Sequence, residues 1–175
     1  MRLPSLISPG ALEELAQLAE ASPAGGCLVE VGVYKGGSAQ RLAEVAGRQG
    51  RALYLYDTFT GIPIKGPWDS HEVGDFADTS AEAIHTAIPT AMVVEGVFPA
   101  SMVPMPPVAL AHLDCDQYES ILSAFGALRP LMMSGGVIVF DDYNALESAN
   151  RAVHDLLGLN GFTMSRCGKA IWTNP

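Results

Sequence analysis

The sequence Val29-Glu-Val-Gly-Val-Tyr-Lys-Gly-Gly-Ser38 reads as the end of a buried strand followed by the start of a helix. Its strand part is mostly apolar, as is typical of a strand with helices on both faces. Gly32 and Gly36 allow the backbone to pass close to a ligand, and Ser38 is suited to cap a helix over 39–46. A tight turn without a ligand has the same pattern, so the turn alone assigns no function.

On both sides of this turn, short apolar runs alternate with amphipathic segments of helix length. This alternation is typical of βαβ units and a mainly parallel sheet. We expect a helix over 10–21, strands over 27–32, 52–57, 91–95, 108–113 and 136–141, and a last strand pairing near 162–172. The prediction is one α/β domain over 1–175, doubly wound, with an N-terminal helical segment (1–26) and an irregular loop (58–79).

The composition narrows the class of protein. With 49% of the 175 residues apolar, the chain can build one sizeable core. Nineteen Asp and Glu against ten Lys and Arg give a formal charge of −9, which argues against binding to nucleic acid or to an anionic membrane and permits a cationic ligand. The three cysteines form no CxxC pair, no secretory signal pattern is present, and no apolar stretch is long enough to span a bilayer, so we expect a cytoplasmic protein.

An acidic residue ends the second expected strand. Asp57 follows Gly32 by 25 residues, a position from which a carboxylate can bind both ribose hydroxyls of a nucleoside. The glycine turn lacks the GxGxxG spacing that seats a pyrophosphate, and Glu30 would repel that group if it faced the site. S-Adenosylmethionine carries no phosphate and has two cationic groups, so it is favoured, while a nicotinamide-dependent enzyme stays open as an alternative.

The third expected strand ends near a glycine and an aromatic residue. Gly96 and Phe98 are placed to form the edge and face of an adenine site. Phe98 fits an ordinary core position equally well.

Four aspartates follow the fourth and fifth strands. Asp114 and Asp116 come after the fourth, and Asp141 and Asp142 after the fifth. Because adjacent parallel strands lie about 4.8 Å apart, acids at their carboxyl ends can converge on one hard cation. Oxygen ligands without a Cys or His pattern favour Mg²⁺, Mn²⁺ or Ca²⁺ over zinc. The alternative is a set of solvated loop acids or helix caps, for which Asp142 is the best candidate.

At these residues the sequence resembles class I S-adenosylmethionine-dependent methyltransferases, and more narrowly the macrocin O-methyltransferase family of natural-product sugar methyltransferases. The resemblance implies a Rossmann-like methyltransferase fold with a seven-stranded sheet. The matching stretches run in order along most of the chain: Glu30–Ser38, Asp57–Pro63, Gly74–Ser80, His112–Ser120 and Gly135–Tyr143.

The resemblance also implies roles for particular residues. Asp116 would be the general base, and a hydroxyl of a small molecule, such as a sugar or diol-containing natural product, would be the methyl acceptor. The Mg²⁺ ligands would be Asp114, Asp141 and Asp142. With the strand-end residues discussed above, the cofactor-binding set is Glu30, Gly32, Tyr34, Ser38, Asp57, Gly96, Phe98 and Asp114.

Other residues carry weaker expectations. His112 is a second candidate base, although two positions before Asp114 on a strand it is expected to be a buried structural histidine. His71 is a candidate for the acceptor pocket, and Cys115 is expected to pack. The apolar stretch Val97–Val108 is a candidate homodimer interface or simply packs in the core. Only 26 residues precede the first strand, fewer than family members usually have, so a cofactor-binding module without catalysis also stays open.

Overall fold

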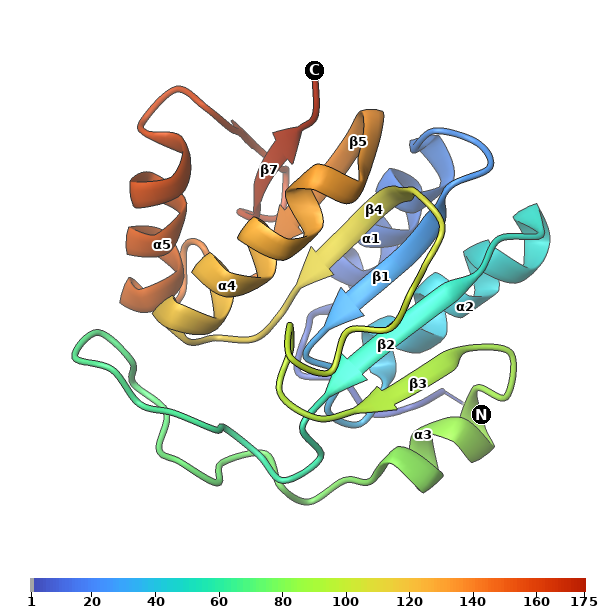
Figure 1. Ribbon diagram of the computed structural model, residues 1–175, viewed down its shortest axis with the longest axis horizontal. Coiled ribbons are helices and arrows are strands. Elements are labelled where there is room, and N and C mark those ends of the chain that lie inside the picture. The colour runs from blue at the N-terminus through green and yellow to red at the C-terminus, as the bar shows by residue number, and fades with distance from the viewer. Residues whose placement is uncertain (1) are drawn as a thin grey trace.

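Seven strands form the sheet of the computed structural model, which describes residues 2–175 (Figure 1). Their order is β3-β2-β1-β4-β5-β7-β6; β1 to β5 are parallel, and β7 runs antiparallel to both β5 and β6. The strands are β1 (Cys27–Val31), β2 (Leu53–Asp57), β3 (Met92–Glu95), β4 (Val108–Leu113), β5 (Met132–Phe140), β6 (Thr163–Met164) and β7 (Ala170–Thr173). The doubly wound, mainly parallel fold is confirmed.

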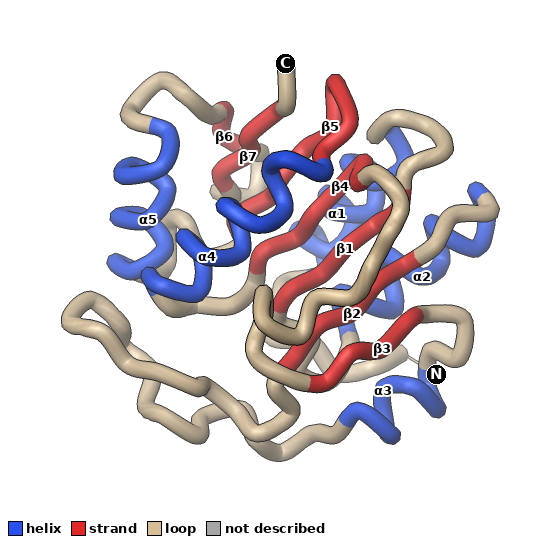
Figure 2. Tube along the Cα trace, viewed as in Figure 1, coloured by secondary structure: helices blue, strands red, loops and turns tan. Residues whose placement is uncertain are grey.

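Helices cover both faces of the sheet (Figure 2). One apolar core lies between the sheet and helices α1, α2 and α3, and a second lies between the sheet and helices α4 and α5. The helices are α1 (Pro9–Ala21), α2 (Gly37–Gln49), α3 (Ala81–Ala87), α4 (Tyr118–Leu128) and α5 (Glu147–Leu157), with a short 3₁₀ helix at Arg129–Leu131. No helix within residues 2–175 has the length and apolar character needed to cross a bilayer.

Several element boundaries differ from the sequence-based expectation, and those of α2, β5 and α5 differ most. Gly36, with φ of 84°, occupies the N-cap of α2, so Ser38 lies inside the helix and does not cap it. Only a residue tolerant of the left-handed region fits there without strain. Strand β5 begins at Met132, earlier than expected, and α5 begins at Glu147, so Asp142 caps no helix.

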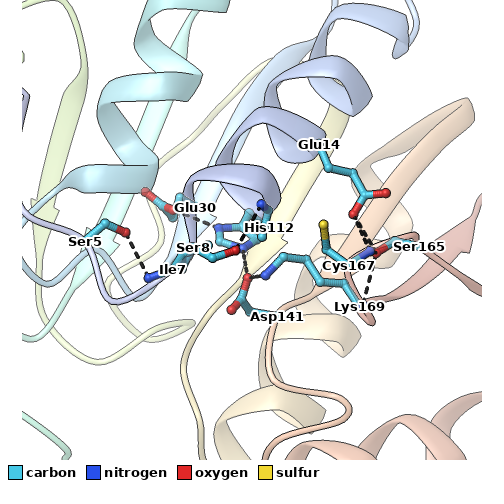
Figure 3. Close-up of polar contacts among 11 residues, drawn as sticks. Ser5, Ile7, Ser8, Glu14, Glu30, His112, Asp141, Ser165, Cys167 and Lys169 are labelled. Carbon is cyan, nitrogen blue, oxygen red and sulfur yellow. Dashed lines mark hydrogen bonds and ion pairs between the residues drawn. The ribbon is translucent and has the colours of Figure 1, made fainter.

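Glu14 on α1 holds the turn between β6 and β7. Its carboxylate accepts hydrogen bonds from the Ser165 hydroxyl at 2.8 Å and from the backbone N–H groups of Arg166 and Cys167 at 2.8 and 3.0 Å. Burial opposes the charged form, but these hydrogen bonds prevail and lower the pKa of Glu14 from 4.5 to about 2. The contact therefore joins the N-terminal helix to the C-terminal hairpin (Figure 3).

Glu14→Gln should lower the free energy of unfolding by about 2 kcal/mol at neutral pH, because an amide cannot accept all of these hydrogen bonds. The pKa of Glu14 is lower in the folded state, so its contribution is present above pH 4.5 and disappears as the pH falls toward 2. Urea unfolding of both proteins, at pH 7 and again in this acidic range, measures the difference. Glu13→Gln, on the exposed side of the same helix, is the control and should change stability by less than about 0.5 kcal/mol. Equal losses in the two variants would contradict the role of Glu14.

Candidate functional site

A cavity of about 290 Å³ lies beyond the carboxyl ends of the parallel strands. Ligands of open α/β sheets bind in this position, and the volume is close to the lower limit of small-molecule sites, about 300 Å³. Of the residues predicted to bind the cofactor or the metal or to act as the base, Glu30 and the second candidate base His112 are absent from the wall. The others all line the cavity: Gly32, Tyr34, Ser38, Asp57, Gly96, Phe98, Asp114, Asp116, Asp141 and Asp142.

Gly32 follows β1 at a point where the chain passes close to the backbone that follows β4. Its φ is 92°, and a Cβ at this position would lie 1.9 Å from the carbonyl oxygen of Asp114. The two strand ends are held together there, since the Asp114 N–H donates to the Val31 carbonyl at 2.9 Å. Only glycine fits this floor of the cavity.

Asp57 braces the glycine turn. Its Oδ2 accepts from the N–H groups of Val33 and Tyr34 at 2.7 and 2.8 Å, and its Oδ1 accepts from the Phe59 N–H at 2.8 Å. A carboxylate accepts about four hydrogen bonds, so Oδ1 has capacity for about one more. Asp57 can therefore receive one ribose hydroxyl, whereas the sequence pattern predicted two.

Aromatic residues form part of the cavity wall. Phe98 is 8% exposed and packs edge-on against Tyr56 at 4.8 Å between ring centroids, so it belongs to both the core and the wall. Tyr34 contacts Phe76 in the same way at 5.3 Å. Such faces suit the flat ring of a nucleobase.

A row of polar side chains runs across four neighbouring strands and reaches the cavity wall at Asp141 (Figure 3). Glu30 on β1 pairs in register with His112 on β4, and its Oε1 lies 2.8 Å from the Nδ1 of His112. The Nε2 of His112 lies 2.8 Å from Oδ1 of Asp141, at the end of β5, and the same oxygen contacts the ammonium of Lys169, which precedes β7. Glu30 and His112 are fully buried. Glu30 is on the same face of β1 as Leu28, which packs in the core on the α1 and α2 side, and it does not line the cavity, so its position does not support a cofactor role.

Opposite charges and hydrogen bonds keep His112 and Asp141 ionised although both side chains are buried. Burial lowers the pKa of His112, but the hydrogen bonds with Asp141 and Glu30 outweigh that effect and raise it to about 10. Burial likewise raises the pKa of Asp141, whereas His112 and Lys169 lower it to about 2. His112 is therefore a structural histidine with both ring nitrogens engaged, and it is not available as a base.

Three carboxylates lie together on the cavity wall. Oxygens of Asp114, Asp116 and Asp142 lie within 4.8 Å of one another. Burial and, next, the charge of Asp141 raise the pKa of Asp114 well above its ordinary value, while burial and the charge of Asp142 raise that of Asp116 to about 8. The pKa of Asp142 is also raised, first by burial and then by Asp141. These acids repel one another and require protons or a cation.

The donor chemistry fits a hard divalent cation. The three acids offer carboxylate oxygens, which Mg²⁺ and Ca²⁺ prefer. A second group, His112, Asp114 and Asp141, also has suitable spacing, but both nitrogens of His112 are already hydrogen bonded. The expected ligands were Asp114, Asp141 and Asp142, whereas the structure groups Asp114 and Asp142 with Asp116. Asp141 lies beside this group, and its Oδ2 has no hydrogen-bond partner among residues 2–175.

The loop between β2 and α3 covers one side of the cavity, and contacts with two helices hold it there. The Asp69 carboxylate accepts from the Tyr118 N–H at 2.9 Å, and the guanidinium of Arg151 lies 4.2 Å from the ring centroid of Trp68. This placement brings His71 to the cavity wall, with its Nε2 4.0 Å from Oδ2 of Asp116. The weak expectation that His71 lines a pocket agrees with this geometry.

Some wall residues escaped the sequence analysis. Gln117 is 1% exposed, lines the cavity and has a buried Nε2 for which residues 2–175 provide no hydrogen-bond partner, so a donor is left for a ligand. Residues 4–7 also line the cavity, and the Leu3 N–H donates to the Gln40 side chain at 2.8 Å nearby. The sequence has no local signal for either contact. Cys115 lines the cavity too, but burial raises the pKa of its thiol, which disfavours a nucleophilic role.

Residues 29–143, which include the glycine turn and all four aspartates, match the family described as "Methyltransferase domain". The chain belongs to this family of methyltransferase domains. It is 30% identical over 159 residues to the 8-demethyl-8-(2,3-dimethoxy-alpha-L-rhamnosyl)-tetracenomycin-C 4'-O-methyltransferase of Streptomyces olivaceus. That match covers 79% of this chain and 60% of the relative, so the chain spans less than two thirds of the relative's length.

Solved structures share the fold. The O-methyltransferase NovP has a TM-score of 0.79 at 22% identity, covering 97% of this chain and 81% of NovP. The calicheamicin methyltransferase CalS11 has a TM-score of 0.74 at 22% identity, covering 93% of this chain and 77% of CalS11. The seven-stranded methyltransferase fold is therefore confirmed.

Proposed function

We propose that this chain is an S-adenosylmethionine-dependent O-methyltransferase that acts on a hydroxyl of a small molecule, such as a sugar or another diol-containing natural product. One observation carries the proposal: a single cavity combines the glycine turn and Asp57 with the acidic group Asp114, Asp116 and Asp142. The methyltransferase family match and the O-methyltransferase from Streptomyces olivaceus support the same class of reaction.

For the cofactor, we infer a site along the first three strand ends. Gly32 keeps the floor open, Asp57 has capacity for a ribose hydroxyl, and Phe98 offers an aromatic face. When bound, S-adenosylmethionine would supply a methyl group already activated by its sulfonium. The acidic wall suits this positive charge, and Tyr34, Ser38, Gly96 and Asp114 complete the proposed set.

For the metal, we infer a hard divalent cation, Mg²⁺ or a similar ion, held by Asp114 and Asp142 with the Oδ2 of Asp141. When bound, such a cation would fix two neighbouring hydroxyls of the acceptor and make the attacking one more acidic. The mutual repulsion of these buried acids supports the assignment, since an added positive charge relieves it.

For the chemical step, we assign the general base to Asp116. The Asp116 carboxylate would take the proton of the acceptor hydroxyl as that oxygen received the methyl group that bound S-adenosylmethionine would supply, with S-adenosylhomocysteine as the leaving group. Asp116 has φ of 59°, a conformation that L residues rarely adopt, and its carbonyl accepts from the Ser148 hydroxyl at 2.6 Å. A strained backbone held by such a contact is typical of residues that function requires in one place. In-line alignment of oxygen, carbon and sulfur would supply most of the acceleration.

The two alternative functions are weaker. A nicotinamide-dependent enzyme is disfavoured by the missing GxGxxG spacing alone, because Glu30 does not face the cavity and so cannot repel a pyrophosphate. A non-catalytic binding module would not need the acidic group or the strained backbone at Asp116.

The expected result of a direct test is methyl transfer from labelled S-adenosylmethionine to at least one glycoside or catechol in a panel. Chelation of divalent cations should lower the rate by a factor of at least about 10², and added Mg²⁺ should restore it. Mass spectrometry of the products measures the transfer, and calorimetry with S-adenosylhomocysteine measures cofactor binding separately. Absence of S-adenosylhomocysteine binding would contradict the cofactor, whereas binding without turnover of any acceptor would favour the module.

A further inference from the structure

Lys169 is a buried cation at the edge of the acidic site. It is 4% exposed, and its ammonium contacts Oδ1 of Asp141. Within residues 2–175, no other Lys or Arg forms an ion pair with an acid of the cavity wall. Lys169 does not line the cavity, and its contact with the cavity wall is through Asp141.

The position of Lys169 follows from the antiparallel strand. Phe140 on β5 pairs with Ala170 on β7, and the next pair of this register is Asp141 and Lys169. Directly opposite residues of an antiparallel pair have neighbouring side chains, so the two charges meet across the ladder. The pair therefore depends on a strand that reverses direction at the edge of an otherwise parallel sheet.

The backbone around Lys169 is fixed. Its N–H donates to the Ser165 hydroxyl oxygen at 3.1 Å, and its carbonyl accepts from the Ser165 N–H at 2.9 Å. Glu14 holds the same turn from α1, as described above. Figure 3 shows Lys169 extending from this turn toward Asp141. These backbone contacts, together with its burial, hold the Lys169 ammonium beside the site.

The two carboxylate oxygens of Asp141 have different partners. Oδ1 receives His112 and Lys169, while no hydrogen bond or ion pair from residues 2–175 uses Oδ2. No Lys or Arg of residues 2–175 forms an ion pair with Asp114, Asp116 or Asp142, although His71 Nε2 lies 4.0 Å from Oδ2 of Asp116 and His112 is grouped with Asp114. Within the described chain, the acidic site therefore contains one carboxylate paired with an ammonium and three that are not.

We propose that Lys169 is a built-in counter-charge of the cation site, which neutralises Asp141 and thereby limits how tightly the site binds a divalent cation. The inference rests on the proposed function, because it concerns the cation that the acids are proposed to hold. A positive charge a few ångströms from a divalent cation repels it, and repulsion at such a distance is strong in a partly buried site. Lys169 therefore acts through Asp141, by placing a positive charge beside the cation site, and takes no direct part in methyl transfer.

Lys169→Gln tests the proposal, because glutamine keeps a hydrogen-bond donor for Oδ1 while it removes the charge. Calorimetric titration with Mg²⁺ and Mn²⁺ should show binding tighter by about tenfold or more than in the wild type. Lys169→Arg keeps the charge and should bind within about threefold of the wild type. Lys65→Gln removes an equal charge from an exposed ion pair outside the cavity wall and should also stay within about threefold.

Thermal unfolding gives a second readout. Added divalent cations should raise the unfolding temperature of Lys169→Gln more than that of the wild type. If the variant folds only when the cation is present, that result also supports the proposal. Unchanged or weaker binding by the glutamine variant, or tighter binding by the arginine variant, would overturn the proposal. If the wild type binds the cation and Lys169→Gln binds it with the same affinity, this inference is wrong and the proposed function is not affected. If neither protein binds Mg²⁺ or Mn²⁺, the inference and the metal part of the proposed function are both wrong.

Discussion

Asp116→Asn should reduce turnover by about 10³-fold, because an amide of nearly the same size cannot take the proton of the acceptor hydroxyl. Asp116 lines the cavity, and its side chain is 15% exposed, so a hydroxyl can reach it. The measurement is the turnover number with saturating S-adenosylmethionine and any acceptor found in the panel. Binding of S-adenosylhomocysteine should stay within about threefold, since no contact of the base with the cofactor is proposed.

Glu119→Gln is the matched control for this change. It converts another acid to its amide three residues further along, on an exposed part of α4 outside the cavity. Its activity should equal that of the wild type. An Asp116→Asn enzyme that keeps more than a tenth of the activity would exclude Asp116 as the base. Loss of S-adenosylhomocysteine binding in the same variant would instead indicate that Asp116 helps to hold the cofactor.

Gly32→Ala should cost more than about 3 kcal/mol of folding free energy and abolish cofactor binding. The added Cβ would lie 1.9 Å from the Asp114 carbonyl oxygen, and both partners are backbone atoms at strand ends that cannot move independently. The φ of 92° adds strain for any residue with a side chain. Urea unfolding measures the loss, and calorimetry with S-adenosylhomocysteine measures binding by whatever protein remains folded.

Gly47→Ala is the control for this second change. Gly47 lies in α2, and a Cβ there would meet nothing within 4 Å. Because alanine favours a helix over glycine, this variant should gain up to about 1 kcal/mol. A Gly32→Ala protein as stable as the wild type would show that the ends of β1 and β4 can separate, contrary to the close packing described here.

The location of the site could be predicted from the sequence because parallel strands end at a common edge. Asp57, Asp114 and Asp141 each follow an apolar run of strand length, and the structure places all three on one cavity wall. The sequence of the irregular loop (58–79) did not indicate which helices the loop would contact. The contacts of Trp68 and Asp69 with α4 and α5 join residues far apart in the chain, and no local pattern specifies them.

The sequence could not predict which face of the sheet the Glu30 side chain is on. In a strand that is apolar on both faces, the usual alternation of polar and apolar residues is missing, so nothing in the sequence assigns Glu30 to a face. The register with β4 decides the matter by placing His112 beside it. The expectation that Glu30 faces a ligand fails for this reason.

By itself, the sequence determined the order of strands and helices, the glycine turn and the placing of acids at strand ends, because these depend on local periodicity and on residues close together in the chain. Only the tertiary structure decided how each acid is used. Asp141 receives Lys169 through an antiparallel register, Asp116 joins Asp114 and Asp142, and Asp57 is largely engaged by backbone N–H groups. The physical reason is that the charge and hydrogen bonding of a carboxylate depend on neighbours within a few ångströms, and here most of those neighbours come from distant parts of the chain.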